Sequence, residues 1–374
     1  MRYVSINSVP ALSTGAVMRQ VVEERRSLGD DCWTMWGRGR AAANEHEFNF
    51  GTEPELYLDV LQTRLDGRAG FHSRRATRRL LRKLDEIDPD IVHLHNVHGY
   101  YVNAEMLFDW LLAHEKVHVN WTLHDCWAFT GHCAHFTFVN CMQWKEHCAL
   151  TSACPQLGMY PKTVCRSSCA WNFRQKKAIF TQLPANRMTL VTPSHWLEGL
   201  AMDSFLAKYP IEVRYNDIDR SVFKPTPSNF RTRLGIGNRR MVLGVASSWT
   251  ERKGLPIFRR LSERLDQSEY AVVLIGLSER QIRDCPKQLI ALPRTKSQKE
   301  LAEAYTAADV HLQPSLEETF GMTVAEAAAC GTPVIVRRGS ACEEAAEHSG
   351  AKAIISDSDD IEELVLRIKE AIAL

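Results

Sequence analysis

The segment from residue 310 to residue 336 constrains the fold of this chain more than any other. An apolar run that ends in a proline, Val310–Pro314, leads into the acidic pair Glu317-Glu318 and then into Phe-Gly. An alanine-rich stretch follows, and after Gly-Thr-Pro a second apolar run begins at Val334. This order predicts a strand, a loop, a helix and a second strand, which is typical of α/β proteins with a parallel sheet.

The chemistry of this unit suits a nucleotide sugar. Gly321 allows close approach of the backbone to a ligand, and the first helical residues, Met322 and Thr323, offer free amide donors to a diphosphate. Glu326 can accept two hydrogen bonds from ribose hydroxyls, and Glu318 is placed for hydroxyls of the group that the diphosphate carries. The alternative is that Glu317 and Glu318 are solvated loop charges and Glu326 is a surface helix residue. The alanines around Glu326 favour a binding role.

Two further segments follow predicted strands. Arg252 and Lys253 lie where a strand gives way to a helix, a position where cations are unfavourable unless an anion is bound. They could clamp a diphosphate leaving group, or they could be an exposed basic pair. We expect Pro293 and Arg294 to contact the base of the nucleotide, and the sequence does not distinguish uracil from guanine.

Histidines are frequent near the ends of predicted strands in the first half of the chain. His95, His98 and His124 follow such strands, where open α/β sheets bind ligands. His93 lies within an apolar run and is expected to be a hydrogen-bonded core residue. Gly15, in a turn after the first strand, either approaches a ligand phosphate or acceptor or only starts a helix.

The motif resembles a known family. Glu318 and Glu326, separated by seven residues and followed by Ala-Cys-Gly-Thr-Pro-Val-Ile, are similar to the signature of the retaining glycosyltransferases of family 4, of the polysaccharide-biosynthesis type. The resemblance extends through most of the chain. It implies the GT-B fold, in the α/β class, with two Rossmann-like domains that face an interdomain cleft.

The resemblance also implies roles for single residues. Glu318 would lie by the donor sugar, Glu326 would bind the ribose and Lys253 the phosphates. His124 would face the sugar near its anomeric carbon, with Asp125 able to orient it. The family's usual arginine, five residues before the lysine, is a serine here, so Arg252 is expected to substitute for it.

The length of 374 residues predicts two domains. We expect an N-terminal, acceptor-binding domain at 1–225 and a C-terminal domain that binds the nucleotide-sugar donor at 226–374. Seven cysteines lie in an insert at 126–169, which is expected to shape the acceptor side. They could bind zinc, although no Cys-x-x-Cys pair is present, or they could be packed thiols or disulfides. The predicted catalytic site contains no metal.

Composition limits the partners. Hydrophobic residues make up 45% and charged residues 24%, and the net charge of +1 gives no reason to expect a nucleic acid. The N-terminus lacks the apolar core of a signal peptide, and no apolar run is long enough to span a bilayer. We therefore expect a cytoplasmic protein. A basic helix face could contact anionic lipid at the membrane or be a solvated stripe; it comprises Arg74, Arg75, Arg78, Arg79 and Arg82.

The resulting expectation is a retaining, metal-independent hexosyltransferase that needs no cofactor apart from its nucleotide-sugar co-substrate. A UDP-sugar is favoured over a GDP-sugar. The expected acceptor is a glycan or glycolipid, typically a lipid-linked oligosaccharide in surface polysaccharide assembly. Two alternatives remain, a GT-B isomerase acting on a nucleotide sugar and a nucleotide-sugar-binding protein without catalysis.

Overall fold

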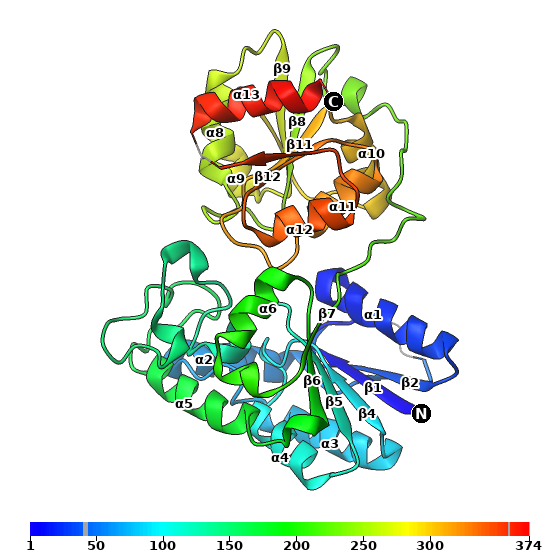
Figure 1. Cartoon of the computed structure of the whole chain (residues 1–374), viewed down its shortest axis with the longest axis vertical. Helices are drawn as coiled ribbons and strands as arrows, with labels where there is room; N and C mark the ends of the chain where they lie inside the picture. The colour runs from blue at the N-terminus through cyan, green and yellow to red at the C-terminus, as the bar shows by residue number, and fades with distance from the viewer. Residues whose placement is uncertain (40–43, 358–359, 374) are drawn as a thin grey trace. The chain divides into compact units, whose positions relative to one another are not determined.

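The structure is a computed structural model that describes residues 1–39, 44–357 and 360–373 (Figure 1). The chain divides into two compact units, Met1–Arg214 and Tyr215–Leu374. The sequence placed the boundary between residues 225 and 226. The division falls earlier because the linking segment packs with the second unit: Tyr215 stacks on His348 with ring centroids 4.3 Å apart, and Phe223 belongs to that unit's core.

The N-terminal unit is built on a seven-stranded sheet, ordered β3-β2-β1-β4-β5-β6-β7, in which every pair of neighbours is parallel. Its strands are β1 (Arg2–Asn7), β2 (Asp31–Trp36), β3 (Glu47–Asn49), β4 (Ile91–Leu94), β5 (His118–Thr122), β6 (Met188–Thr192) and β7 (Ile211–Val213). Its α-helices are α1 (Leu12–Ser27), α2 (Glu53–Asp66), α3 (Arg74–Ile87), α4 (Ala104–Ala113), α5 (Ser168–Phe180) and α6 (His195–Met202). Five short 3-10 helices lie at η1 (Trp127–Phe129), η2 (Thr137–Val139), η3 (Gln143–Lys145), η4 (Ala185–Arg187) and η5 (Phe205–Lys208).

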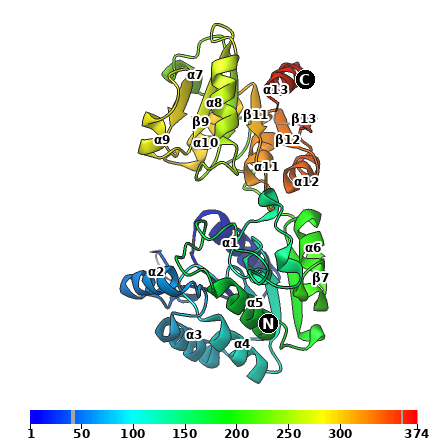
Figure 2. The same cartoon turned by 90° about the vertical axis from the view of Figure 1, so that its left-hand side faces the viewer.

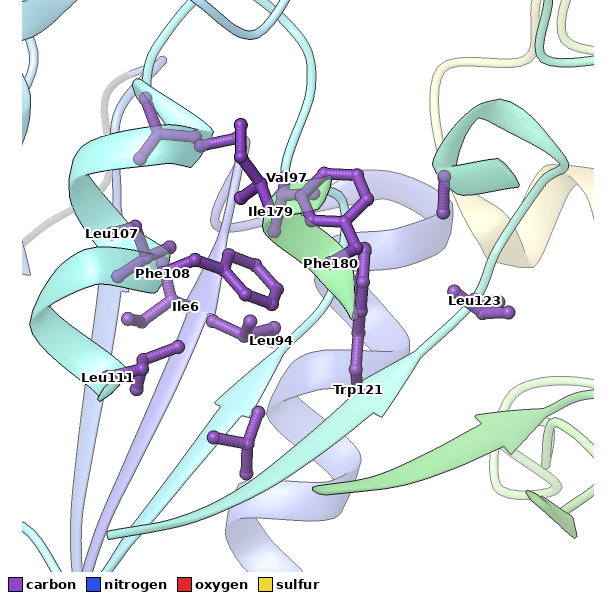
Figure 3. Close-up of a cluster of buried hydrophobic side chains, with 14 of the residues drawn as sticks. Ile6, Leu94, Val97, Leu107, Phe108, Leu111, Trp121, Leu123, Ile179 and Phe180 are labelled. Atoms are coloured by element: carbon purple, nitrogen blue, oxygen red, sulfur yellow. The ribbon is translucent and has the colours of Figure 1, made fainter. Parts of the chain in front are cut away.

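The core of this unit follows from alternation along the strands. Ile6, Leu94 and Trp121 point to one face, where they meet apolar side chains of α4 and α5 such as Phe108 and Phe180 (Figure 3). Tyr3, two residues from Ser5 on β1, points to the other face and packs with Val21, Val22 and Cys32. A second set of side chains on that face is polar and forms part of the candidate site.

The C-terminal unit has a six-stranded parallel sheet, ordered β10-β9-β8-β11-β12-β13. Its strands are β8 (Arg240–Val245), β9 (Tyr270–Ile275), β10 (Leu289–Leu292), β11 (Val310–Gln313), β12 (Val334–Arg337) and β13 (Ala353–Ser356). Its helices are α7 (Phe230–Arg233), α8 (Leu255–Arg264), α9 (Glu279–Arg283), α10 (Gln298–Ala307), α11 (Met322–Ala329), α12 (Ala341–His348) and α13 (Ile361–Ile372).

Helices cover both faces of this second sheet (Figures 1 and 2). One face packs with α10, α11 and α12 through residues such as Val273 and Val324. The other packs with α8 and α13 through Phe258 and Ile368. The sequence also predicts strands at, for example, Arg2–Asn7, Met188–Thr192 and Leu289–Leu292, and β1, β6 and β10 have these bounds. It predicts a final helix over Asp359–Ala373. Asp359 lies outside the described residues, and α13 is the described part of this helix.

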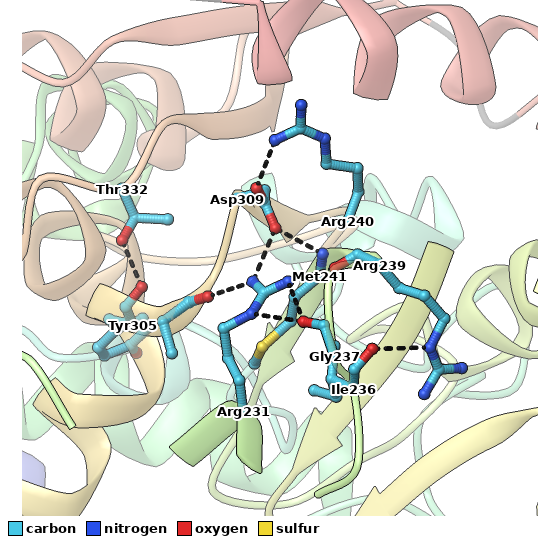
Figure 4. Close-up of polar contacts among 10 residues, drawn as sticks. Arg231, Ile236, Gly237, Arg239, Arg240, Met241, Tyr305, Asp309 and Thr332 are labelled. Carbon is cyan, nitrogen blue, oxygen red and sulfur yellow. Dashed lines mark hydrogen bonds and ion pairs between the residues drawn. The ribbon is translucent and has the colours of Figure 1, made fainter. Parts of the chain in front are cut away.

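An acidic residue joins β8 and β11 at their amino ends. Asp309, directly before β11, accepts hydrogen bonds from the Met241 backbone amide at 2.7 Å and from Arg231 Nη1 at 3.0 Å. Arg240 Nη1 lies 3.1 Å from its other carboxylate oxygen (Figure 4). This network fixes the register of the two strands whose opposite ends carry the candidate site.

Candidate functional site

In the C-terminal sheet, the order in which the chain adds strands reverses between β8 and β11. From β8 the chain proceeds to β9 and β10 on one side, and then crosses to β11 on the other side of β8. In open parallel sheets such a switch point leaves a crevice at the carboxyl ends of the two strands, where ligands bind. The loop after β8 contains Arg252 and Lys253, and the loop after β11 contains Glu317 and Glu318.

These two loops are joined by charged contacts. Lys253 forms an ion pair with Glu318 through Nζ and Oε1. Arg252 Nη1 donates to the carbonyl oxygen of Glu317 and lies 3.9 Å from the same Oε1 of Glu318. The Leu316 amide donates to the carbonyl of Arg252 at 2.8 Å. The interpretation of the acidic pair as solvated loop charges is wrong, because Glu317 is only 1% exposed and the Glu318 side chain 13%.

Gly321 ends the second loop and caps α11. Its φ of 110° lies in the left-handed region, which residues with a side chain rarely adopt. A Cβ atom there would lie 2.9 Å from Cys342 Sγ, so the backbone packs closely on α12. Met322 and Thr323 form the first turn, and among the described residues the buried Thr323 hydroxyl oxygen has no hydrogen-bond partner. The helix therefore begins four residues after Glu318, and the first amides of a helix have no acceptor within it. Their contact with a diphosphate stays a prediction.

Glu326 lies one turn into α11 and is held by a tyrosine. The hydroxyl of Tyr305, a fully buried residue of α10, donates to Glu326 Oε2 at 2.9 Å. The Tyr305 carbonyl in turn accepts from the Thr332 hydroxyl at 2.6 Å (Figure 4). Burial raises the pKa of Glu326 to about 7, although the Tyr305 bond lowers it. One carboxylate oxygen is thus fixed by the protein, which orients the group for a ligand.

Arg294 contacts the loop after β8. Its Nε donates to the Ser247 carbonyl at 2.8 Å, and its Nη2 donates to the same oxygen. The Pro293 carbonyl accepts from the Gly276 amide at 3.3 Å. Both residues therefore lie at the carboxyl edge of the sheet. Arg294 is hydrogen-bonded to the loop that contains Lys253. A contact with the base stays a prediction.

Two histidines lie just beyond the carboxyl ends of neighbouring strands in the N-terminal unit: His95 follows β4 and His124 follows β5. His95 Nδ1 lies 2.9 Å from His124 Nε2, and their rings stack with centroids 5.2 Å apart. His93 is buried and hydrogen-bonded to Tyr3 and Thr122, as expected for a core histidine. Burial lowers the pKa of His124 to about 4 and that of His95 well below its usual value. Both rings are neutral at pH 7.

Asp125 pairs with a different histidine from the one predicted. Its Oδ2 lies 3.0 Å from His98 Nε2, and its Oδ1 accepts from the Trp127 amide at 2.8 Å. Burial alone would raise the pKa of Asp125, but the adjacent His98 brings it down to about 2. The chain turns into η1 directly after Asp125 and directs that carboxylate to His98. His124 forms a hydrogen bond with His95.

Gly15 lies within α1 rather than in a turn before it, since the helix starts at Leu12. A Cβ at Gly15 would come within 2.8 Å of the Pro10 carbonyl carbon. The glycine thus lets the helix approach the loop that follows β1. This close approach accounts for it without a ligand.

The cysteine-rich insert is organised around a buried lysine. Lys176 of α5 is fully buried, and its Nζ donates to the carbonyls of Trp127 at 2.8 Å and Thr130 at 3.0 Å. It also lies 3.4 Å from the centroid of the Trp127 ring, and burial lowers its pKa to about 7. None of the eleven cysteines, all of which lie within the described residues, forms a disulfide. Within residues 1–39, 44–357 and 360–373, no three His, Cys, Asp or Glu side chains are arranged to hold a metal ion.

Helices α2 and α3 expose an unusual surface. Arg74, Arg75, Arg78 and Arg82 of α3 are exposed, whereas Arg79 pairs with Glu55 of α2 and so leaves the predicted basic face. Helix α2, beside it, exposes four large apolar side chains by 54% to 69%. They are Tyr57, Leu58, Leu61 and Leu65. In the part of the chain that the structure covers, no helix has the length and apolar character needed to traverse a bilayer.

Comparison with solved structures identifies the fold as GT-B, as predicted. Sucrose-phosphate synthase from Thermosynechococcus elongatus superposes with a TM-score of 0.67 at 14% identity, over all of this chain and 90% of that one. HepE of Anabaena, solved in complex with UDP-glucose, gives 0.63 at 16% identity over the same shares. At this identity the likeness establishes the fold alone.

The sequence has a matching family model over part of its length. Residues 228–374 match the family described as Glycosyl transferases group 1. The alpha-galactosylglucosyldiacylglycerol synthase of Streptococcus pneumoniae is 29% identical over 135 residues, which are 33% of this chain and 36% of that protein. The chain spans about a third of the length of the curated relatives it matches.

Some site residues could not be found from the sequence. Tyr305 lies in an ordinary amphipathic helix, and only its contact with Glu326 gives it a role. The bond between His95 and His124 joins residues 29 positions apart. The one available signal was that both histidines follow parallel strands, whose carboxyl ends meet at one edge of the sheet.

Proposed function

We propose that this protein is a retaining glycosyltransferase that moves a hexosyl group from a nucleoside diphosphate sugar to an acceptor hydroxyl. We favour a UDP-sugar over a GDP-sugar as the donor. The observation that carries the proposal is the meeting of Lys253, Arg252 and Glu318 at the switch point of the C-terminal sheet, where α11 begins. Cations, free helix amides and a carboxylate are the groups that a sugar diphosphate requires.

In the proposed reaction the bond between the anomeric carbon and the diphosphate oxygen breaks first. Lys253, Arg252 and the amides of Gly321–Thr323 stabilise the departing charge. Glu318 and His124 hold hydroxyls of the oxocarbenium-like sugar, and Glu326 holds the ribose. The acceptor oxygen then bonds to the anomeric carbon on the same face and passes its proton to the departing phosphate oxygen. Because fixed cations balance the charge, the proposal requires no divalent ion and no further cofactor.

We propose a glycolipid acceptor, such as a lipid-linked oligosaccharide of surface polysaccharide assembly. The matched relative is named for a diacylglycerol glycolipid, and the exposed face of α2 and α3 combines apolar and basic side chains as interfacial helices do. In this proposal the N-terminal unit binds the acceptor, and the protein works peripherally at the cytoplasmic face of a membrane.

The proposal is tested by a screen of UDP- and GDP-sugars for thermal stabilisation and for donor hydrolysis. We expect a UDP-sugar to stabilise the protein, Glu326→Ala to abolish that stabilisation, and Glu318→Ala to lower turnover mainly. Negligible effects of both substitutions would refute the assignment. Donor rearrangement without acceptor would indicate an isomerase, and binding without turnover a non-catalytic nucleotide-sugar-binding protein.

A further inference from the structure

Several thiols of the cysteine-rich insert gather around Gly131, against the start of α5. Cys169 is the second residue of that helix. The Gly131 amide donates to Cys148 Sγ at 3.2 Å. A Cβ atom on Gly131 would lie 2.6 Å from Cys148 Cβ and still closer to the carbonyl oxygen of Cys169. Only a glycine therefore allows these segments to pack so closely, and Cys133 follows it by two residues.

Cys154 completes this group and lies between two of its thiols. Its sulfur is hydrogen-bonded to the thiol of Cys133 and to the thiol of Cys169. Cys133 and Cys169 are buried, with exposed fractions of 7% and 0%, whereas Cys154 is partly exposed. The central thiol is therefore also the one that a small reagent in solution can reach.

The hydrogen bonds assign the protons of these three thiols. The bonds with Cys133 and Cys169 lower the pKa of Cys154, and the backbone amide of Gln156 lowers it further. The same bonds, together with burial, raise the pKa of Cys133 and that of Cys169. Each outer thiol thus donates its S–H to the sulfur of Cys154, which is the thiolate. The thiolate is the form of cysteine that attacks a disulfide.

Cys165 shows what the neighbouring thiols add. Its pKa is lowered as well, chiefly by a hydrogen bond with Ser167, whose Oγ lies 3.6 Å from Cys165 Sγ. A reagent disulfide that reacts at Cys165 meets a hydroxyl, which cannot displace the added group. At Cys154 the contacting groups are thiols, and a thiol can complete the exchange.

We propose that Cys154 is a redox-active thiol that forms a reversible disulfide with Cys133 or Cys169 when the protein meets a small disulfide such as oxidised glutathione. The sulfur of Cys154 attacks one glutathione sulfur, the bond between the two glutathiones breaks, and one glutathione leaves and takes up a proton from water. The outer cysteine then attacks Cys154 Sγ, and the second glutathione leaves with the proton of that cysteine. The cysteine pair loses two electrons, and oxidised glutathione gains them.

The new bond would fasten the outer part of the insert. Residues 150–153, directly before Cys154, are exposed. A disulfide to Cys133 or Cys169 would join this segment covalently to the buried base of the insert and would need only small movements, because the sulfurs are already in contact. Disulfides that form and break in this way are typical of redox sensing. The insert is then held more firmly in oxidising surroundings than in reducing ones.

Peptide mapping tests the inference on the full chain. The protein is equilibrated with defined ratios of oxidised to reduced glutathione, free thiols are blocked with iodoacetamide, and disulfides are identified by mass spectrometry. We expect a disulfide from Cys154 to Cys133 or to Cys169 that dithiothreitol reverses, and at most a bound glutathione on Cys165. A disulfide of the insert that does not include Cys154, or no intramolecular disulfide at any ratio, would overturn the inference.

Substitutions identify the partners. Cys133→Ser and Cys169→Ser each leave one neighbour and should direct the disulfide of Cys154 to it, whereas the double variant should stop at a glutathione adduct on Cys154. Cys165→Ser is the matched control and should keep the disulfide. An intramolecular disulfide of Cys154 that persists in the double variant would refute the assigned partners.

Two further measurements test the state of the thiols. Cys154 should react with iodoacetamide at pH 7 about tenfold faster than Cys148 or more, since Cys148 is also partly exposed but burial raises its pKa to about 12. Equal rates would refute the thiolate. Within the described residues the structure gives these thiols no metal-binding arrangement. One zinc ion per chain, found by elemental analysis and bound to these cysteines, would overturn the redox role.

Discussion

Lys253 and Glu318 form an ion pair between the loops that follow β8 and β11, with their side chains only 20% and 13% exposed. The two residues proposed to hold the diphosphate and the sugar therefore neutralise each other before a ligand arrives. In the proposed complex with a sugar diphosphate, this pair is exchanged for a contact between Lys253 and a phosphate and a contact between Glu318 and sugar hydroxyls.

The exchange predicts opposite effects of two substitutions on UDP affinity. Glu318→Gln should tighten UDP binding by roughly threefold to tenfold, since a partly buried competing charge is removed, while turnover falls about a hundredfold. Lys253→Ala should weaken UDP binding by about tenfold or more. Calorimetric titration measures both affinities. Glu303→Gln, which affects a surface pair with Arg233 on α7, is the control, and weaker UDP binding by Glu318→Gln would contradict the exchange.

Gly321→Ala should destabilise the C-terminal unit more than an equivalent glycine substitution elsewhere. The residue combines a φ of 110° with a neighbour, Cys342 Sγ, 2.9 Å from the added Cβ. Gly339→Ala is the matched control, because its φ of 66° is also positive but no atom lies within 4 Å. We expect a loss of about 1 kcal/mol for Gly339→Ala and roughly 2–4 kcal/mol for Gly321→Ala in urea unfolding. Equal losses would show that α11 does not pack on α12 as closely as described.

Affinity for a nucleotide sugar should depend on pH through Glu326. Its pKa of about 7 means that the carboxylate, which we propose accepts hydrogen bonds from both ribose hydroxyls, is protonated in an increasing fraction of molecules as the pH falls below 7. Affinity should thus decrease toward acid pH. A nucleotide sugar is the suitable probe, because its doubly esterified diphosphate does not titrate in this range.

Two variants identify the group that titrates. Glu326→Gln should bind weakly and without this pH dependence. Tyr305→Phe should move the midpoint to higher pH, since the bond from the Tyr305 hydroxyl lowers the pKa of Glu326. A midpoint that stays in place in the glutamine variant would assign the titration to another group.

The exposed face of α2 and α3 should bind anionic membranes. Replacing Arg74, Arg75, Arg78 and Arg82 with glutamine should reduce binding to phosphatidylglycerol vesicles by about tenfold or more, since each basic residue contributes about 1 kcal/mol near such a surface. Leu58→Ser with Leu61→Ser should reduce binding at high salt as well, where electrostatic attraction is screened. Vesicle co-sedimentation measures both. As a control, Arg79→Gln, at the position paired with Glu55, should have a smaller effect than Arg78→Gln. Equally strong binding of the protein to neutral vesicles would argue against the charge-based contact.

The features that could be predicted from the sequence are those whose structure depends on residues adjacent in the chain, such as strands and loops. Buried parallel strands are near-continuous apolar runs, so β8 and β9 could be located directly. The acidic pair and Gly321 are separated by two residues, so they fall in one loop. Strand β2, Asp31–Trp36, has polar residues at Asp31 and Thr34 that interrupt its apolar run, and it was not predicted.

The contacts that orient the site cross between elements and could not be predicted in the same way. Asp125 is next to His124 in the sequence, but η1 directs its carboxylate to His98. Similarly, Arg79 has the same helical spacing as the exposed arginines of α3. It does not belong to their exposed face, because it pairs with Glu55 on α2. Such pairings depend on how helices and loops are placed on the sheet, which neither periodicity nor motif spacing specifies.

The amine of Lys176 offers a native reporter on the segment that follows His124. Because its nitrogen is enclosed between the Trp127 ring and two backbone carbonyls, an acylating reagent in solution can reach it only when the 127–130 turn detaches from α5. The rate at which mass spectrometry finds this lysine modified would then measure how often the turn opens, and slower labelling with a bound substrate would reveal ligand-induced ordering without any substitution.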